Sequence, residues 1–247
     1  MRKNLRKIFE AGITLVVTAS FVICYYVTKD INAVVTGNAA AAVSTAANSL
    51  PEILLDAGHG GYDGGCVGIN GEIEKGINLT ITKSLYYMCD VFGFNTRATR
   101  LKDKALDDEA KDGVYEQKKS DIQNRLEFFQ SSKNAVCISI HQNKFTDSEY
   151  WGAQMFYSGK NAESEKLAQI LQETITGALQ PDNTREIKRD DEMYVLKTEL
   201  PAVMVECGFL SNPDEANKLS DSTYQKQMAL SVFVGVNKYI QQNCDND

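Results

Sequence analysis

The chain lacks the residue patterns on which several common classes of protein depend. Its six cysteines are spread along 247 residues, without the Cys-x-x-Cys spacing of a thiolate metal site or the density of a disulfide framework. Acidic residues outnumber basic residues by 33 to 26, and no dense basic cluster is present. Binding to nucleic acid requires a basic face that neutralises phosphates, so we predict that the protein does not bind nucleic acid.

Histidine is also scarce, which makes the position of each histidine informative. His59 and His141 are the two histidines of the chain, and each ends a short, mostly apolar stretch. In an open α/β fold, a side chain just past the end of a strand points into the crevice where ligands bind. A lone histidine is more often a structural residue, but two imidazoles in one crevice favour a metal site.

Two glutamates occupy comparable positions. Glu74 follows the glycine-rich stretch 58–65, which is not a dinucleotide motif because Asp63 stands where the third glycine is required. Glu206 ends the apolar segment 202–205, where an ionised carboxylate is costly to bury unless it is paired, coordinated or used in catalysis. Two histidines and one glutamate form the ligand set of catalytic zinc sites, and a further glutamate can accept a proton from water. The residue types therefore favour a zinc hydrolase.

A thiol nucleophile is the alternative interpretation of the same region, because Cys207 follows Glu206 directly. Neighbouring side chains along a strand point to opposite faces. If Glu206 faces the cleft, we therefore expect Cys207 to face the core.

Apolar patterns of the strand type and the helix type alternate along the chain. We expect a single α/β domain over residues 51–243, with a twisted, mostly parallel or mixed six-stranded sheet flanked by helices. The predicted strands lie at 52–56, 94–99, 135–140, 152–157, 193–197 and 202–206. The predicted helices lie at 76–92, 120–132, 163–179 and 224–241.

The first fifty residues differ from the rest. Basic residues precede a mostly apolar stretch at 11–27, so we predict that 1–30 is an N-terminal signal or membrane anchor and that 31–50 is a flexible linker. The length of the apolar stretch leaves both a cleaved signal and an uncleaved anchor open. The basic flank keeps the N-terminus inside and predicts export of the domain beyond it.

Four ordered stretches resemble the signatures of zinc-dependent N-acetylmuramoyl-L-alanine amidases. They are 55–61, Glu74-Lys75 with Asn78-Leu79, 139–143 and 206–212. The resemblance implies one Zn²⁺ held by His59, Glu74 and His141, with Glu206 as the catalytic glutamate. Glu72 lies two positions from Glu74, but the lysine that follows aligns the family motif on Glu74.

The family's activity is hydrolysis of the amide bond between the lactyl group of N-acetylmuramic acid and L-alanine in peptidoglycan. A basic leader joined to a lone domain resembles the sporulation- and germination-specific amidases of the CwlD type, which prepare spore cortex for muramic-δ-lactam formation. The implied partners are peptidoglycan, the membrane through the N-terminal segment, and a regulatory or targeting protein, since no wall-binding module is present. The implied location is the outer side of the cytoplasmic membrane, including the forespore intermembrane space.

Two other functions remain as alternatives. One is a zinc carboxypeptidase or endopeptidase acting on cell-wall peptides, and the other is a non-catalytic wall-binding protein. Asn143 lies two positions after His141 and could donate a hydrogen bond in the cleft. Arg185 lies in a loop before a predicted strand and could reach a carboxylate of the stem peptide. Both residues are equally compatible with plain surface positions.

Overall fold

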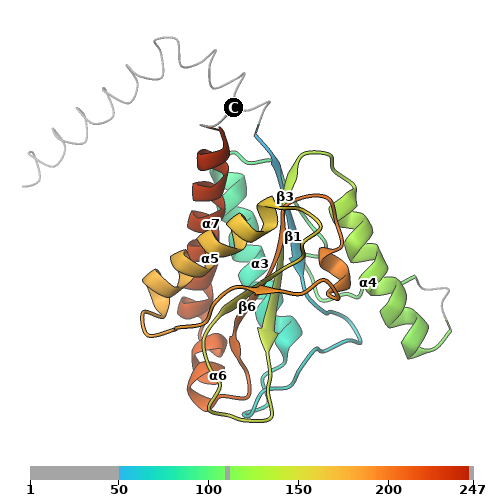
Figure 1. Ribbon diagram of the computed structural model, residues 1–247. Coiled ribbons are helices and arrows are strands. Elements are labelled where there is room, and N and C mark those ends of the chain that lie inside the picture. The colour runs from blue at the N-terminus through green and yellow to red at the C-terminus, as the bar shows by residue number, and fades with distance from the viewer. Residues whose placement is uncertain (1–49, 109–111, 245–247) are drawn as a thin grey trace, which may run out of the picture. The chain divides into compact units, whose positions relative to one another are not determined.

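A computed structural model describes residues 50–108 and 112–244 (Figure 1). The predicted leader at 1–30, and the predicted linker at 31–50 except its last residue, lie outside the described residues. From Pro51 onward the described chain folds as one unit. Within these ranges, no helix has the length and apolarity needed to cross a membrane.

A mixed six-stranded sheet with the order β2-β1-β3-β6-β4-β5 forms the centre of this unit. Strand β4 is antiparallel to β6, and the other neighbouring strands are parallel. The three central strands are nearly continuous apolar runs, as expected for strands covered on both faces. The bounds are β1 Glu52–Ala57, β2 Thr96–Ala98, β3 Ala135–Asn143, β4 Gln154–Tyr157, β5 Lys188–Arg189 and β6 Ala202–Phe209.

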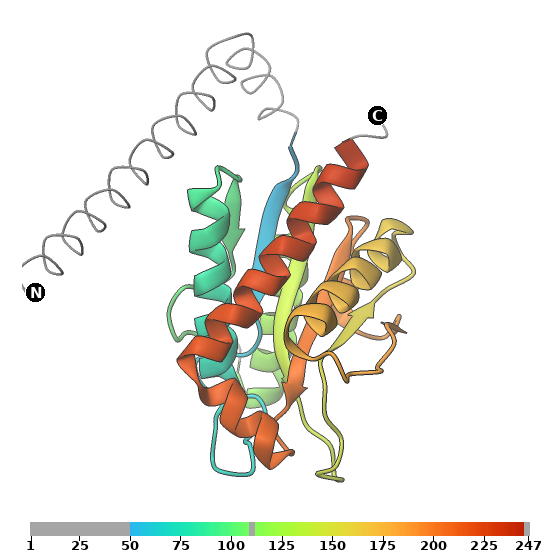
Figure 2. The ribbon, with the colours of Figure 1, turned by 90° about the vertical axis from the view of Figure 1, so that its left-hand side faces the viewer.

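Helices cover both faces of the sheet, which confirms the predicted α/β architecture. Helices α3, α5 and α7 form one layer, in which α7 packs between the other two (Figure 2). Helix α4 and the short 3-10 helix η2 cover the opposite face (Figure 1). The bounds are α3 Glu74–Val91, α4 Val114–Gln130, α5 Glu163–Leu179, η2 Tyr194–Leu196, α6 Pro213–Ser220 and α7 Ser222–Cys244.

The strand predicted at 193–197 is wrong. Tyr194–Leu196 is the 3-10 helix η2, and the sixth strand is the two-residue β5, Lys188–Arg189. Val195 and Leu196 are buried because they pack in a cluster with Phe129 of α4, and their backbone pairs with no strand. A short apolar run has too few residues for its periodicity to separate a strand from a helical turn.

Two helices also differ from the prediction. Helix α4 begins at Val114 rather than 120, because its first turns carry exposed side chains and therefore show no apolar face. Helix α6 was not predicted at all. It is eight residues long, and its start is fixed by a local cap, in which Asn212 Oδ1 accepts hydrogen bonds from the backbone N–H groups of Asp214 and Glu215.

The parallel pairing of the central strands brings the predicted site residues to one edge of the sheet. His59 comes two residues after the end of β1, and His141 lies near the end of β3. Glu206 of β6 is the direct register partner of His141. Glu74 is the first residue of α3, which packs against β1 and β3. All four residues therefore come from elements that end or begin at the same edge.

Candidate active site

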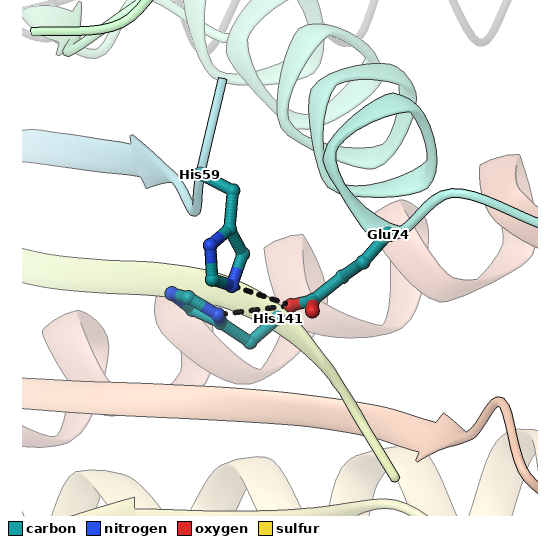
Figure 3. Close-up of side chains that lie close together, drawn as sticks. All are labelled: His59, Glu74 and His141. Atoms are coloured by element: carbon teal, nitrogen blue, oxygen red, sulfur yellow. Dashed lines mark hydrogen bonds and ion pairs between the residues drawn. The ribbon is translucent and has the colours of Figure 1, made fainter. Parts of the chain in front are cut away.

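His59, Glu74 and His141 point toward one another at this edge (Figure 3). Glu74 Oε1 lies 3.2 Å from His59 Nε2 and 3.1 Å from His141 Nδ1. One ligand atom of each residue lies within 4.8 Å of those of the other two. Two imidazole nitrogens and one carboxylate oxygen converging on one point match the donor set that holds a catalytic zinc ion.

Charge holds this cluster together. Burial opposes protonation of His59, but the carboxylates of Glu74 and Asp63 raise its pKa to about 9. Burial also opposes ionisation of Glu74, yet the two histidines keep its pKa well below the ordinary value. The carboxylate thus stabilises a positive charge at this point. A divalent cation would supply that charge and displace the imidazole proton.

Glycine is required where the backbone passes close to the cluster. A Cβ atom on Gly58 would lie 2.2 Å from the His141 ring. A Cβ atom on Gly65 would lie 2.5 Å from Glu74 Oε2, and Gly65 has a φ of 72°, a conformation that favours glycine. The glycine-rich stretch therefore serves close packing around the three side chains.

Two buried arginines fix the loop that carries His59. Arg125 of α4 donates to the carbonyl oxygens of Ala57 and His59, each at 2.8 Å. Arg100 donates to the carbonyl oxygens of Ala57 at 2.9 Å and Gly58 at 2.8 Å. These bonds hold His59 at a φ of 60°, an uncommon conformation for a residue other than glycine.

Arg125 is itself held by buried carboxylates. It donates to Asp56 Oδ1 and to Asp121 Oδ2, each at 2.6 Å. Burial of Asp56 opposes ionisation, but Arg125 keeps the pKa of Asp56 below its ordinary value. Sequence reasoning missed both arginines. The one available signal for Arg125 was its position beside Leu126 on the buried face of α4.

The second nitrogen of His59 also has a defined partner. Nδ1 of His59 donates to Asp63 Oδ2 at 2.9 Å, and Lys118 Nζ lies 3.1 Å from Asp63 Oδ1. With a proton on Nδ1, Nε2 is the ring nitrogen available to bind a metal ion in place of its own proton. Carboxylates that orient metal-binding histidines in this way also raise the basicity of the ligand.

Replacement of Asp63 by asparagine is therefore expected to weaken zinc binding by about 10–100-fold, because the amide loses the charge that orients His59. Competition with a chromogenic chelator would measure the affinity without reference to activity. Asp90→Asn is the matched control, since Asp90 is an exposed carboxylate near the end of α3 opposite to Glu74. Equal affinities in the wild type and Asp63→Asn would contradict the assigned role.

Glu206 lies beside this cluster on β6. Its Oε2 atom is buried and accepts no hydrogen bond from the described residues. Burial raises the pKa of Glu206 to about 7, and the charges of His141, Glu74 and His59 also act on it. A buried carboxylate oxygen without a protein partner suits a group that exchanges a proton with a water molecule or a substrate.

Cys207 faces the core, as expected from strand alternation. Its side chain is fully buried, and burial raises its pKa above the ordinary range. A neutral, buried thiol is a poor nucleophile. The thiol alternative therefore has no support in the structure.

The two predicted substrate residues lie outside the histidine cluster. Asn143 is the last residue of β3, and its Oδ1 accepts from the backbone N–H of Lys144 at 2.8 Å. Arg185 donates to the oxygen of Trp151 at 2.7 Å and to Gln154 Oε1 at 3.2 Å. Gln154 pairs with Glu206 across β4 and β6, so Arg185 lies next to the site. Arg185 lines a pocket of about 390 Å³ with Asp147, Glu149, Tyr150, Trp151, Asn183 and Thr184.

Comparisons with known proteins agree with this site. A family model described as N-acetylmuramoyl-L-alanine amidase (Amidase_3) matches residues 53–238. The germination-specific N-acetylmuramoyl-L-alanine amidase of Bacillus subtilis is 35% identical over 78% of this chain and 81% of its own length. The solved CwlD amidase of Clostridioides difficile, in complex with the GerS lipoprotein, is 36% identical with a TM-score of 0.75, over 77% of this chain and 98% of that one.

A more distant relative has the same fold. The catalytic domain of CwlV, an N-acetylmuramoyl-L-alanine amidase from Bacillus (Paenibacillus) polymyxa, is 25% identical with a TM-score of 0.65, over 78% of this chain and 99% of that one. The family predicted from four short motifs is thus confirmed by a family model that matches residues 53–238. The chain belongs to the N-acetylmuramoyl-L-alanine amidase family and is an amidase of the CwlD type.

Proposed function

We propose that this amidase uses one zinc ion, held by His59, Glu74 and His141, and that Glu206 is its general base and acid. The observation that supports the proposal is the convergence of three ligand atoms within 4.8 Å, beside a buried carboxylate oxygen that lacks a protein partner. The donor set has the composition of catalytic zinc sites with an open fourth position. The residues present therefore fit the metal.

The chemistry follows from the residues around the scissile amide. When bound, zinc lowers the pKa of water and polarises a carbonyl oxygen. Glu206 accepts the proton of the attacking water and delivers it to the leaving nitrogen of L-alanine. The bond between the lactyl carbonyl carbon and that nitrogen breaks, which leaves a lactyl carboxylate on the sugar and a free amino group on the peptide.

Arg185, on the β4 side of Glu206, and Asn143, at the end of β3, are proposed to contact the substrate. Arg185 is held in place by Trp151 and Gln154, and its guanidinium lies 4.5 Å from the ring centre of Phe209. A fixed guanidinium at the rim of a pocket is suited to bidentate binding of a carboxylate. Stem peptides carry such carboxylates, so we assign the pocket of Arg185 to the peptide part of the substrate.

Spore cortex is the proposed substrate in the cell. The B. subtilis relative is germination-specific, and the C. difficile relative was solved with a lipoprotein partner. We accordingly propose a protein partner for this chain, and export of the domain by the segment 1–30, so that it is anchored to or secreted at the outer side of the membrane. Peptidoglycan lies outside the cytoplasmic membrane, which agrees with this location.

Digestion of purified peptidoglycan tests the reaction. We expect release of whole stem peptides with a free L-alanine amino terminus, identified by mass spectrometry, with no loss of single C-terminal amino acids. Release of single amino acids or of peptide fragments would instead favour the carboxypeptidase or endopeptidase.

The role in spore cortex is tested separately. Spores that lack the gene are expected to lack muramic-δ-lactam, and a normal lactam content would contradict the assignment.

A further inference from the structure

A second groove lies on α4 and η2 and shares no lining residue with the pocket of Arg185. It has a volume of about 480 Å³ and is lined by Tyr115, Lys118, Lys119, Ile122, Gln123 and Tyr194 of η2. The side chains of Tyr115, Ile122 and Tyr194 are 77%, 44% and 44% exposed. None of the lining residues is acidic, whereas Asp147 and Glu149 line the pocket of Arg185. The two hollows therefore differ in the chemistry of what they can bind.

The groove is connected to the zinc ligands by one side chain. Lys118 lines the groove, and its Nζ lies 3.1 Å from Asp63, the carboxylate that accepts from His59. A molecule that contacts Lys118 in the groove would thus touch a side chain paired with the carboxylate that orients His59.

The groove also lies on the face of the sheet to which Glu206 points. Met204 packs in the cluster with Phe129 of α4 and Val195 of η2. Since alternate residues of a strand share a face, Glu206 points to the same side as Met204. Helix α4 and η2, which form the groove, thus border the cleft that contains the catalytic glutamate.

We propose that this groove binds the glycan strand of peptidoglycan next to the muramic acid whose amide is cleaved. The inference rests on the proposed function. The scissile amide joins a sugar polymer to a peptide, so the substrate continues in both directions from the reacting carbon. The pocket of Arg185 matches the charged peptide, and the groove matches the neutral sugar.

The lining residues suit a sugar. Each ring of Tyr115 and Tyr194 presents an apolar body with a polar tip, which can pack against the C–H face of a pyranose. Lys118, Lys119 and Gln123 supply N–H donors for hydroxyl and N-acetyl oxygens at the edge of the ring.

The test compares the wild type with the double variant Tyr115→Ala, Tyr194→Ala. Calorimetry would measure binding of a peptide-free glycan oligosaccharide to the zinc-loaded protein, and we expect about ten-fold weaker binding in the variant. The KM for release of stem peptides from polymeric peptidoglycan should rise by a similar factor, with kcat unchanged. Tyr87→Ala is the control, since Tyr87 is 55% exposed on α3, in the layer that covers the opposite face.

Each outcome bears on the inference. The inference would be overturned if the wild type did not bind the glycan, or if the wild type and the double variant bound it equally well. A loss of kcat in the double variant with normal glycan affinity would also overturn it. Binding of a protein partner that depends on the two tyrosines, with unchanged glycan affinity, would assign the groove to that partner instead. Failure of the wild type to release any stem peptide would contradict the proposed function, while the calorimetric comparison would still test the groove.

Discussion

Glu206→Gln is expected to lower turnover by about 10²–10⁴-fold and to leave zinc content unchanged. The amide has nearly the size and shape of the carboxylate but cannot accept the proton of the attacking water. Glu206 is absent from the group of side chains that converge as ligands, so its loss removes no metal contact. Peptide release from peptidoglycan would measure the rate, and elemental analysis of the purified variant would measure zinc.

The control for this variant is Glu72→Gln. Glu72 is the nearby glutamate, and its Oε2 accepts from the backbone N–H of Asn70 at 3.0 Å. It lies in neither the ligand group nor the strand of Glu206, so Glu72→Gln should retain wild-type turnover and zinc. Substantial turnover by zinc-loaded Glu206→Gln would remove Glu206 from the mechanism, whereas loss of zinc would make it a ligand.

The convergence of the candidate site residues at one edge of the sheet follows from local pattern. His59 and His141 come at the ends of apolar runs, and parallel pairing of β1 with β3 brings the ends of such runs together. Glu206 interrupts the apolar character of β6, where a carboxylate needs a function. For these residues, the strand pattern and the cost of burying a charge contained enough information to place them in one crevice.

The supporting residues could not be predicted in the same way. Arg100 and Arg125 donate to carbonyl groups that lie 42 to 68 positions earlier in the chain. Such contacts depend on how α4 and its preceding loop return to β1, which no local periodicity encodes. In the sequence, Asp63 was notable only because it stands where a dinucleotide motif requires its third glycine. Its hydrogen bond to His59 occurs with His59 in a left-handed backbone conformation, which local pattern does not predict.

The strand at the edge of the sheet also could not be predicted from local sequence pattern. The apolar residues of η2 satisfy a strand pattern as well as a helical turn, and packing beneath α4 decides between them. The actual edge strand, β5, consists of Lys188 and Arg189, both exposed. It pairs with β4 over two residues only, which is too short for a side-chain pattern from which a strand could be inferred.

His141→Ala is expected to abolish zinc retention and to reduce amidase activity below detection. His141 supplies one of three ligand atoms, and two ligands do not make the usual donor set of a catalytic zinc site. The fold should persist, because Glu74 still accepts from the N–H groups of Gln142 and Cys66, at 3.1 and 2.8 Å. The variant therefore separates loss of the metal from loss of structure.

Thermal unfolding gives a readout that does not depend on catalysis. A ligand that binds only the folded state stabilises it by about 4 kcal/mol when present at a thousand times its dissociation constant. A chelator should consequently lower the Tm of the wild type and of the control Glu72→Gln, but should not change that of His141→Ala. If His141→Ala retained one zinc ion per chain and a Tm that falls with chelator, the ion would have to be held by other side chains. The convergence of His59, Glu74 and His141 would then be a structural ion-pair cluster, and the assignment of a hydrolytic centre to this edge of the sheet would fail with it.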